Sequence, residues 1–200
     1  GRHRGHAMSE DMMIRIRTAE PSDAGPIAEM HVATWRIAYA GILPDDVLLG
    51  LTPGAEQRNW ARIIATIDHE FTVHVAEAAN GELLAYGSAG PVRPNGLPLS
   101  GEVYTLYVSP DHQGQGLGRE LLFSMFARLQ AQGFGSAMLW VLAANPARFF
   151  YHAMGGAVAA ERRESHFGVA LDEVAYAWPD LAKVCRQFDM TYQGRAGGYH

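Results

Sequence analysis

The alternation of apolar and charged side chains marks the first structured segment of the chain. Residues 13–19 read MIRIRTA, a period of two that is typical of a half-buried strand. A helical period follows Pro21, a residue that favours the first position of a helix, and Gly41 with Pro44 would end it. The apolar face of this helix is expected at Ile27, Met30, Thr34 and Ile37.

A β-hairpin is expected around the dipeptide Asn80-Gly81. Strand-like runs flank it on both sides, and the two residues readily take positive φ in a tight turn. Before the hairpin, a short helical turn and a second helix from about Pro53 to Ile67 are expected.

The second half of the chain continues with alternating strands and helices. GEVYTLYVSP (residues 101–110) predicts a strand, and a helix ended by Gly133 follows a glycine loop. SAMLWVLAA predicts a strand that is covered on both faces, and NPARFFYHAMGG a short helix before two last strands. The apolar face of the helix before Gly133 is expected at Leu121, Leu122, Met125, Phe126 and Leu129.

These elements predict an α/β fold with a mixed sheet and helices on its faces. One domain is expected at residues 13–180, with a disordered leader or cloning remnant at 1–12 and a frayed, glycine-rich tail at 181–200. With a net charge of −5 the chain lacks the basic footprint of a nucleic-acid-binding protein. Its one cysteine, Cys185, permits no internal disulfide, and the longest apolar run is too short to span a bilayer, so a cytoplasmic protein is expected.

Three glycines, Gly114, Gly116 and Gly118, stand between a predicted strand and a predicted helix. Glycine lets a ligand approach the backbone, and the first N–H groups of a helix have no acceptor within it, so this loop is suited to an anion. The Lys-Ser/Thr ending of a Walker A loop and the acidic residue of a dinucleotide fingerprint are both missing. On the loop alone, a plain glycine-rich turn remains the alternative.

The surrounding residues resemble the GNAT superfamily of N-acetyltransferases. YVSPDHQGQGLGRELL matches its acetyl-coenzyme A motif through Gln113, Gly116 and Gly118. NPARFFYHAMGG and TWRIAYAGILPDDVL resemble a later and an earlier segment of the family, so the resemblance covers roughly residues 13–179. It implies a GNAT fold, whose mostly antiparallel sheet has strands splayed at the cofactor site, and acetyl-coenzyme A as the cosubstrate without a metal.

The resemblance also implies which residues would hold the cofactor. Backbone N–H groups of the glycine loop would take the pyrophosphate, and the strand before it would pair with the pantetheine arm. For Asn145, capping of the following helix is the alternative role, and for Arg119 a solvated position on the helix. The expected cofactor-binding residues are Leu106, Tyr107, Val108, Gln113, Gly114, Gln115, Gly116, Leu117, Gly118, Arg119 and Asn145.

Transfer of an acetyl group to an amine sets three chemical tasks. By resemblance, Tyr151 would protonate the departing thiolate, with a structural core tyrosine as the alternative, and the backbone N–H of Val108 would stabilise the oxyanion. Glu102 would accept the proton of the amine, directly or through water, although an exposed glutamate at the strand end explains it equally well. Trp35, Tyr39 and Tyr104 would line the acceptor site, with a purely structural role as the alternative for the first two.

The sequence therefore predicts an N-acetyltransferase that acts on a primary amine, with a small molecule favoured over a protein or peptide amine. A sensor that binds acyl-coenzyme A without turnover and a nucleotide-binding protein of another fold are the competing hypotheses. Neither nucleic acid nor a membrane is expected as a partner, and a homodimer is compatible with the resemblance. No defensible metal-ligand spacing is found among four of the histidines, His31, His74, His152 and His166.

Overall fold

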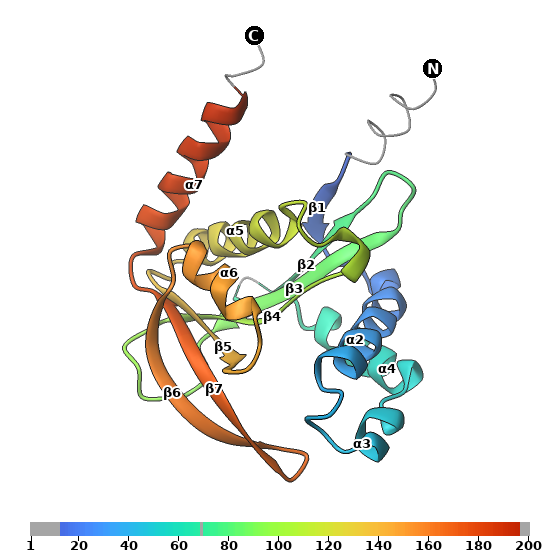
Figure 1. Ribbon diagram of the computed structural model, residues 1–200. Helices are drawn as coiled ribbons and strands as arrows, with labels where there is room; N and C mark the ends of the chain where they lie inside the picture. The colour runs from blue at the N-terminus through green and yellow to red at the C-terminus, as the bar shows by residue number, and fades with distance from the viewer. Residues whose placement is uncertain (1–12, 69, 197–200) are drawn as a thin grey trace, which may run out of the picture. The chain divides into compact units, whose positions relative to one another are not determined.

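The computed structural model of the protein describes residues 13–68 and 70–196 (Figure 1). The leader expected at 1–12 lies outside the described residues. The strands are β1 (Arg15–Thr18), β2 (Thr72–Glu77), β3 (Leu83–Pro91), β4 (Gly101–Val108), β5 (Ala137–Leu142), β6 (Ala157–His166) and β7 (Val169–Trp178). The helices are η1 (Pro21–Asp23), α2 (Ala24–Ala38), α3 (Asp45–Gly50), α4 (Pro53–Ala65), η2 (Pro110–His112), α5 (Leu117–Ala131), α6 (Ala147–Ala153) and α7 (Leu181–Ala196).

The strands follow the order β1-β2-β3-β4-β5-β7-β6. β1 with β2, β5 with β7, and β6 with β7 pair antiparallel, whereas β4 with β5 is parallel. The predicted mixed, mostly antiparallel sheet with flanking helices is confirmed. No helix in the described part of the chain has the length and apolar character of a bilayer span.

The described residues form two compact units, and the division between them falls within β3, β4 and α5. One unit holds those of Gly1–Ser88 and Thr105–Ser124, and the other those of Ala89–Tyr104 and Met125–His200. The glycine loop belongs to the first unit, and the short helix α6 belongs to the second.

The core of the first unit lies between α2, α4 and strands β2 and β3. Ile27 and Ala28 of α2 are fully buried and meet Trp60 of α4 and Tyr86 of β3. Ile37, which the sequence placed on the buried face of α2, is 69% exposed. At 3.6 residues per turn, the ten residues between Ile27 and Ile37 turn the second side chain roughly 80° away from the first.

The hairpin at Asn80-Gly81 exists, but its turn differs from the expected one. Only Gly81 has a positive φ, +88°, whereas Asn80 keeps an ordinary backbone and accepts a hydrogen bond from the N–H of Glu82. The Gly81 N–H donates to Ala78 O, and the Ala78 N–H to Glu82 O. A longer loop with one left-handed glycine therefore replaces the two-residue turn.

A two-residue turn with two positive φ values occurs instead in the hairpin of β6 and β7, the long pair of strands in Figure 1. Its residues are Phe167 (φ 52°) and Gly168 (φ 80°), and Phe167 is exposed. β6 is an edge strand of the sheet, and its middle residues, 161–164, are all charged. The sequence indicated the two strands but not the geometry of their turn.

The helical predictions in the second half of the chain are confirmed apart from the tail. The five expected face residues of α5 are each fully buried, and Gly133 ends the helix at φ +94°. The tail expected to be frayed is instead helical from Leu181 to Ala196. Asp180 starts this helix by accepting a hydrogen bond from the N–H of Lys183, and Leu181 is fully buried.

Candidate active site

The glycine loop connects the end of β4 to the first residue of α5. Gly114 and Gly116 have φ values of 80° and 82°, which favour glycine, and no other atom lies within 4 Å of a side chain added at either. The backbone conformation, rather than crowding within the protein, thus requires glycine here. The space beside these two residues is open to a ligand.

The first residues of α5 follow directly on this loop. The Glu120 N–H donates to Gly116 O at 3.1 Å, so the amides of Leu117, Gly118 and Arg119 precede the first backbone bond of the helix. Leu117 is buried and anchors the helix, whereas the four residues before it are exposed. This arrangement suits an anion such as a pyrophosphate.

Side chains at both ends of the loop have defined positions. The Gln113 side-chain amide donates to Val108 O at 3.3 Å, which ties the loop back to β4. The Arg119 guanidinium lies 5.9 Å from the ring centre of Phe123, one turn further along α5. Arg119 is half-buried, so its charge lies at the helix surface near the open loop.

The end of β4 carries the residues expected to pair with pantetheine. The parallel register of β4 with β5 covers Gly101 with Ala137 and Glu102 with Met138. Leu106, Tyr107 and Val108 lie further along β4, beyond that register, and are half-buried. The pairing of β4 with β5 therefore ends before these three residues, as expected where two strands splay apart.

The predicted acceptor wall on α2 is a continuous aromatic stack. Trp35 and Tyr39 stack at 4.5 Å between ring centres, and His31 stacks on the other side of Trp35 at 5.4 Å. The edge of Tyr107 meets His31 at 6.2 Å. The structure thus joins two predicted acceptor residues with a predicted cofactor residue through a histidine that the sequence did not single out for this role.

His31 also has polar partners on both ring nitrogens. Its Nδ1 lies 3.1 Å from the Tyr86 hydroxyl, and its Nε2 lies 3.6 Å from a carboxylate oxygen of Glu56. Burial lowers the pKa of His31 and outweighs the attraction of Glu56, which acts in the opposite direction. His31 is therefore neutral at pH 7. Its spacing of four residues from Trp35 was the signal available in the sequence.

Glu102, the expected general base, is fully buried in the second unit. The backbone N–H of Arg93 donates to its Oε1 at 3.0 Å, and the Arg93 guanidinium donates to Oε2 from Nε (3.1 Å) and Nη2. This carboxylate is therefore paired, in contrast to the exposed strand-end glutamate considered as the alternative. The Arg93 side chain is itself 63% exposed.

Tyr104 belongs to the same polar group. Its hydroxyl donates to Pro91 O, and the Arg93 guanidinium lies 5.2 Å from its ring centre. Burial, with a further contribution from the charge of Glu102, raises the pKa of Tyr104 to about 12. The phenol therefore stays protonated at neutral pH.

Tyr151 lies on α6 and is largely buried. Its ring packs against Tyr176 at 6.1 Å and edge-on against Trp178 at 6.5 Å. Asn145 precedes this helix and accepts a hydrogen bond from the Ala147 N–H at 2.9 Å through its side-chain oxygen. The capping role considered for Asn145 is thus present, and its side-chain NH₂ makes no hydrogen bond within the described part of the chain.

The strand register sets Glu102 and Tyr151 on opposite faces of the sheet. Glu102 is opposite Met138, whereas Tyr151 packs against Tyr176, whose partner on β5 is Leu139. Successive residues of a strand point to opposite faces. The two side chains therefore do not share a face of the sheet.

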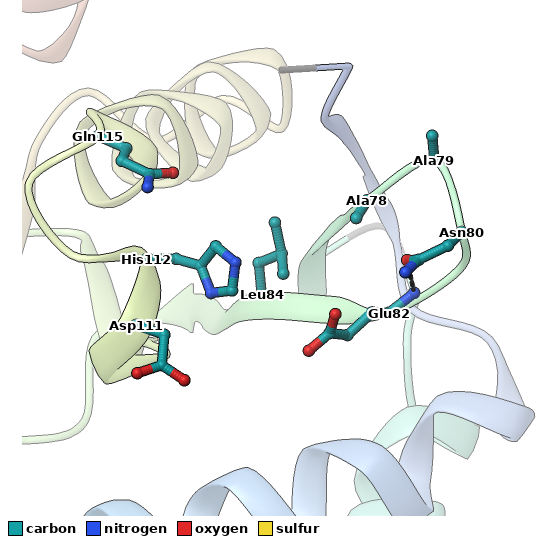
Figure 2. Close-up of a pocket in the computed structure, with 8 residues that line it drawn as sticks. All are labelled: Ala78, Ala79, Asn80, Glu82, Leu84, Asp111, His112 and Gln115. Carbon is teal, nitrogen blue, oxygen red and sulfur yellow. Dashed lines mark hydrogen bonds between the residues drawn. The ribbon is translucent and has the colours of Figure 1, made fainter. Parts of the chain in front are cut away.

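A pocket of about 600 Å³ lies beside the glycine loop in the first unit (Figure 2). The hairpin loop and the loop after β4 both face it, and it includes the predicted cofactor residue Gln115. Its lining residues are Ala78, Ala79, Asn80, Glu82, Leu84, Asp111, His112 and Gln115. In the described part of the chain, no three His, Cys, Asp or Glu residues gather in a way that could hold a metal ion.

Comparison with known proteins agrees with this geometry. The model of the acetyltransferase (GNAT) family matches residues 35–155. The uncharacterized N-acetyltransferase YuaI of Bacillus subtilis (strain 168) is 34% identical over 171 residues, which cover 85% of this chain and 95% of YuaI. A phosphinothricin N-acetyltransferase of Alcaligenes faecalis is 33% identical over 100 residues, 50% of this chain and 45% of that protein.

A solved structure extends the similarity to the fold. YncA of Salmonella typhimurium, solved with its cofactor acetyl-CoA, superposes with a TM-score of 0.63 and 25% identity, over 84% of this chain and 94% of YncA. The family match covers more than half of the chain, and the YuaI alignment covers most of it. The chain therefore belongs to the acetyltransferase (GNAT) family.

Proposed function

We propose that this protein is an N-acetyltransferase that moves the acetyl group of acetyl-coenzyme A to the primary amine of a small molecule. In the reaction, the amine nitrogen bonds to the thioester carbon, the carbon–sulfur bond breaks, and the amine loses a proton. Family membership and the acetyl-CoA bound to YncA support the donor. The phosphinothricin N-acetyltransferase among its relatives supports a small-molecule acceptor.

The open backbone at Gly114 and Gly116 is the observation that carries this proposal. The N–H groups of residues 113–118 would hold the pyrophosphate of the cofactor, with Arg119 at the rim. The backbone of residues 106–108 would pair with the pantetheine arm, and the free NH₂ of Asn145 would add a donor. The cofactor supplies the activated acetyl group, and these residues bind and orient it.

Three residues would assist the transfer. Tyr151 would donate its proton to the thiolate, and the Val108 N–H would stabilise the oxyanion. Glu102 would accept the amine proton, directly or through water. The opposite faces of Glu102 and Tyr151 fit a thioester threaded between β4 and β5, with the acid on the sulfur side and the base on the amine side. Trp35, Tyr39 and Tyr104 would line the acceptor site.

Calorimetric binding of acetyl-coenzyme A and a thiol-release assay across an amine panel test this function. Gly116→Glu places a carboxylate where the pyrophosphate would bind, and we expect it to weaken the affinity for acetyl-coenzyme A more than tenfold. Gly133→Glu is the matched control, since Gly133 also has positive φ and open surroundings but lies after the last residue of α5, at the other end of that helix. Equal affinity in the two variants would refute the assignment of the loop. Cofactor binding without thiol release for any amine would refute the transfer reaction.

A further inference from the structure

One face of the sheet in the second unit carries a group of charged and aromatic side chains. Register places Trp140 opposite Ala175, and Glu173 opposite both Leu142 and Arg162. Residues two apart on a strand share a face, so Trp140, Glu173 and Arg162 lie on the same side as Glu102. This is the face opposite the one on which Tyr151 packs, and the proposed base lies on it.

Glu173 has an unused oxygen although its carboxylate is nearly buried. The side chain is only 9% exposed. Its Oε1 accepts from Arg162 Nε at 3.1 Å and lies 3.5 Å from His166 Nε2. Its Oε2 has no hydrogen-bond partner among the residues that the structure describes. This oxygen keeps acceptor capacity for a ligand that donates hydrogen bonds.

Arg162 beside it has unused donors. Its guanidinium stacks on the Trp140 ring, 3.8 Å from the ring centre, which fixes its plane. Only Nε is engaged, with Glu173 at 3.1 Å and more distantly with Glu164 at 3.9 Å. Within the described part of the chain, neither Nη1 nor Nη2 makes a hydrogen bond. The free edge of a fixed guanidinium matches a carboxylate, which it can bind through two parallel hydrogen bonds.

The unused acceptor of Glu173 and the unused donors of Arg162 carry opposite charges and belong to residues that are directly paired across two strands. Glu173 and Arg162 carry opposite charges, so a ligand with one charge would engage only one of the two unused groups. A ligand with adjacent ammonium and carboxylate groups would engage both residues.

We propose that this face binds the head group of an α-amino acid, with its ammonium on Glu173 Oε2 and its carboxylate on Arg162 Nη1 and Nη2. This inference rests on the proposed function, for which it specifies the acceptor as an amino acid acetylated on its α-amine. It separates such an acceptor from polyamines and peptide N-termini, because those lack a carboxylate next to the amine.

Binding is measured by calorimetry on the full chain saturated with coenzyme A, so that no turnover occurs. The twenty standard L-amino acids serve as probes, and the tightest binder is then compared with its α-amide and its deamino acid. We expect at least one amino acid to bind and each analogue to bind about tenfold more weakly or worse, because each loses one charged partner. Absence of binding by all twenty, or equal affinity of the amide, would overturn the proposal.

Three variants assign the contacts to residues. Glu173→Gln should weaken binding of the amino acid and leave the affinity for its deamino analogue unchanged. Arg162→Gln should weaken binding of the amino acid but not binding of its amide. Arg163→Gln is the matched control on the same strand, with a side chain that is 70% exposed. Should Glu173→Gln fail to fold, Arg162→Gln still decides the matter. If Arg162→Gln binds the amino acid with unchanged affinity, the proposal is overturned. If the wild type does not bind coenzyme A, only the proposed function is overturned.

Discussion

Gly156→Ala would disturb the packing between Trp178 and the helix that carries Tyr151. A Cβ at this position would lie 2.7 Å from Cζ2 of Trp178 and 3.0 Å from the carbonyl oxygen of Tyr151. Trp178 cannot easily move away. It is 1% exposed, its ring lies 4.9 Å from that of Phe126, and its indole N–H donates to Met154 O at 3.0 Å.

The size of the effect follows from these contacts. Inserting a methyl group into a packed site costs about 1–3 kcal/mol. If the indole shifts, its hydrogen bond to Met154 is lost, which adds about 1 kcal/mol. Gly156→Ala should therefore lower the free energy of unfolding by about 2–4 kcal/mol. Gly155→Ala is the control, since its added Cβ has room, 4.0 Å from the Trp178 indole nitrogen, and only its backbone at φ +88° is strained, at about 1–2 kcal/mol.

Urea unfolding of the single variants and of the double variant Gly156→Ala/Trp178→Phe measures the contact directly. Phenylalanine lacks the second ring of the indole, so the double variant should lose less stability than the sum of the two single losses. Wild-type stability in Gly156→Ala, or strict additivity in the double variant, would refute this reasoning. A drop in thiol release by Gly156→Ala that exceeds its unfolded fraction would link the packing to Tyr151.

Three further predictions concern the first unit. Burial acts to raise the pKa of Asp23, but hydrogen bonds from Arg17 and the backbone hold it below its usual value. Denaturant titration should therefore show that the protein loses stability as the pH falls below about 4. Asp23→Asn should abolish this acid-dependent loss. Burial lowers the pKa of His31, so the unfolded chain binds a proton at this residue more readily than the folded chain does. The stability of the wild type should therefore decline as the pH falls through about 6.5. An equal decline in the His31→Gln variant would contradict this prediction. Thr52 accepts a hydrogen bond from the Ala55 N–H at the start of α4. Thr52→Ala should lower the free energy of unfolding by about 1 kcal/mol in thermal denaturation. An unchanged melting temperature would show that this cap does not stabilise the protein.

Features that depend on local sequence were predicted well. The buried face of α5 and the glycine that ends this helix follow from periodicity and backbone freedom, which act within a few residues. Ile37 was misplaced because the period alone does not say where the buried arc of α2 is centred. That centre depends on α4 and on strands β2 and β3, which pack against the helix.

In the candidate site, the sequence predicts the backbone conformation of the glycine loop but not the side-chain pairings. Gly114 and Gly116 can be recognised from the sequence because their conformation requires glycine. The pairing of Glu102 with Arg93 depends on the path of a loop, and the pairing of Glu173 with Arg162 depends on strand register. His31 meets Tyr86 through the tertiary fold, 55 positions away in the chain. No local pattern encodes these distances.

The charged run of β6 has a consequence for the behaviour of the protein in concentrated solution. An edge strand offers unpaired backbone groups to any other extended chain, and charged side chains discourage such pairing. Residues 161–164 place four charges in succession on this edge. The same strand would therefore serve two purposes, with Arg162 turned toward a ligand and its neighbours keeping separate molecules from joining their sheets. Changes made here to alter acceptor choice would also alter solubility.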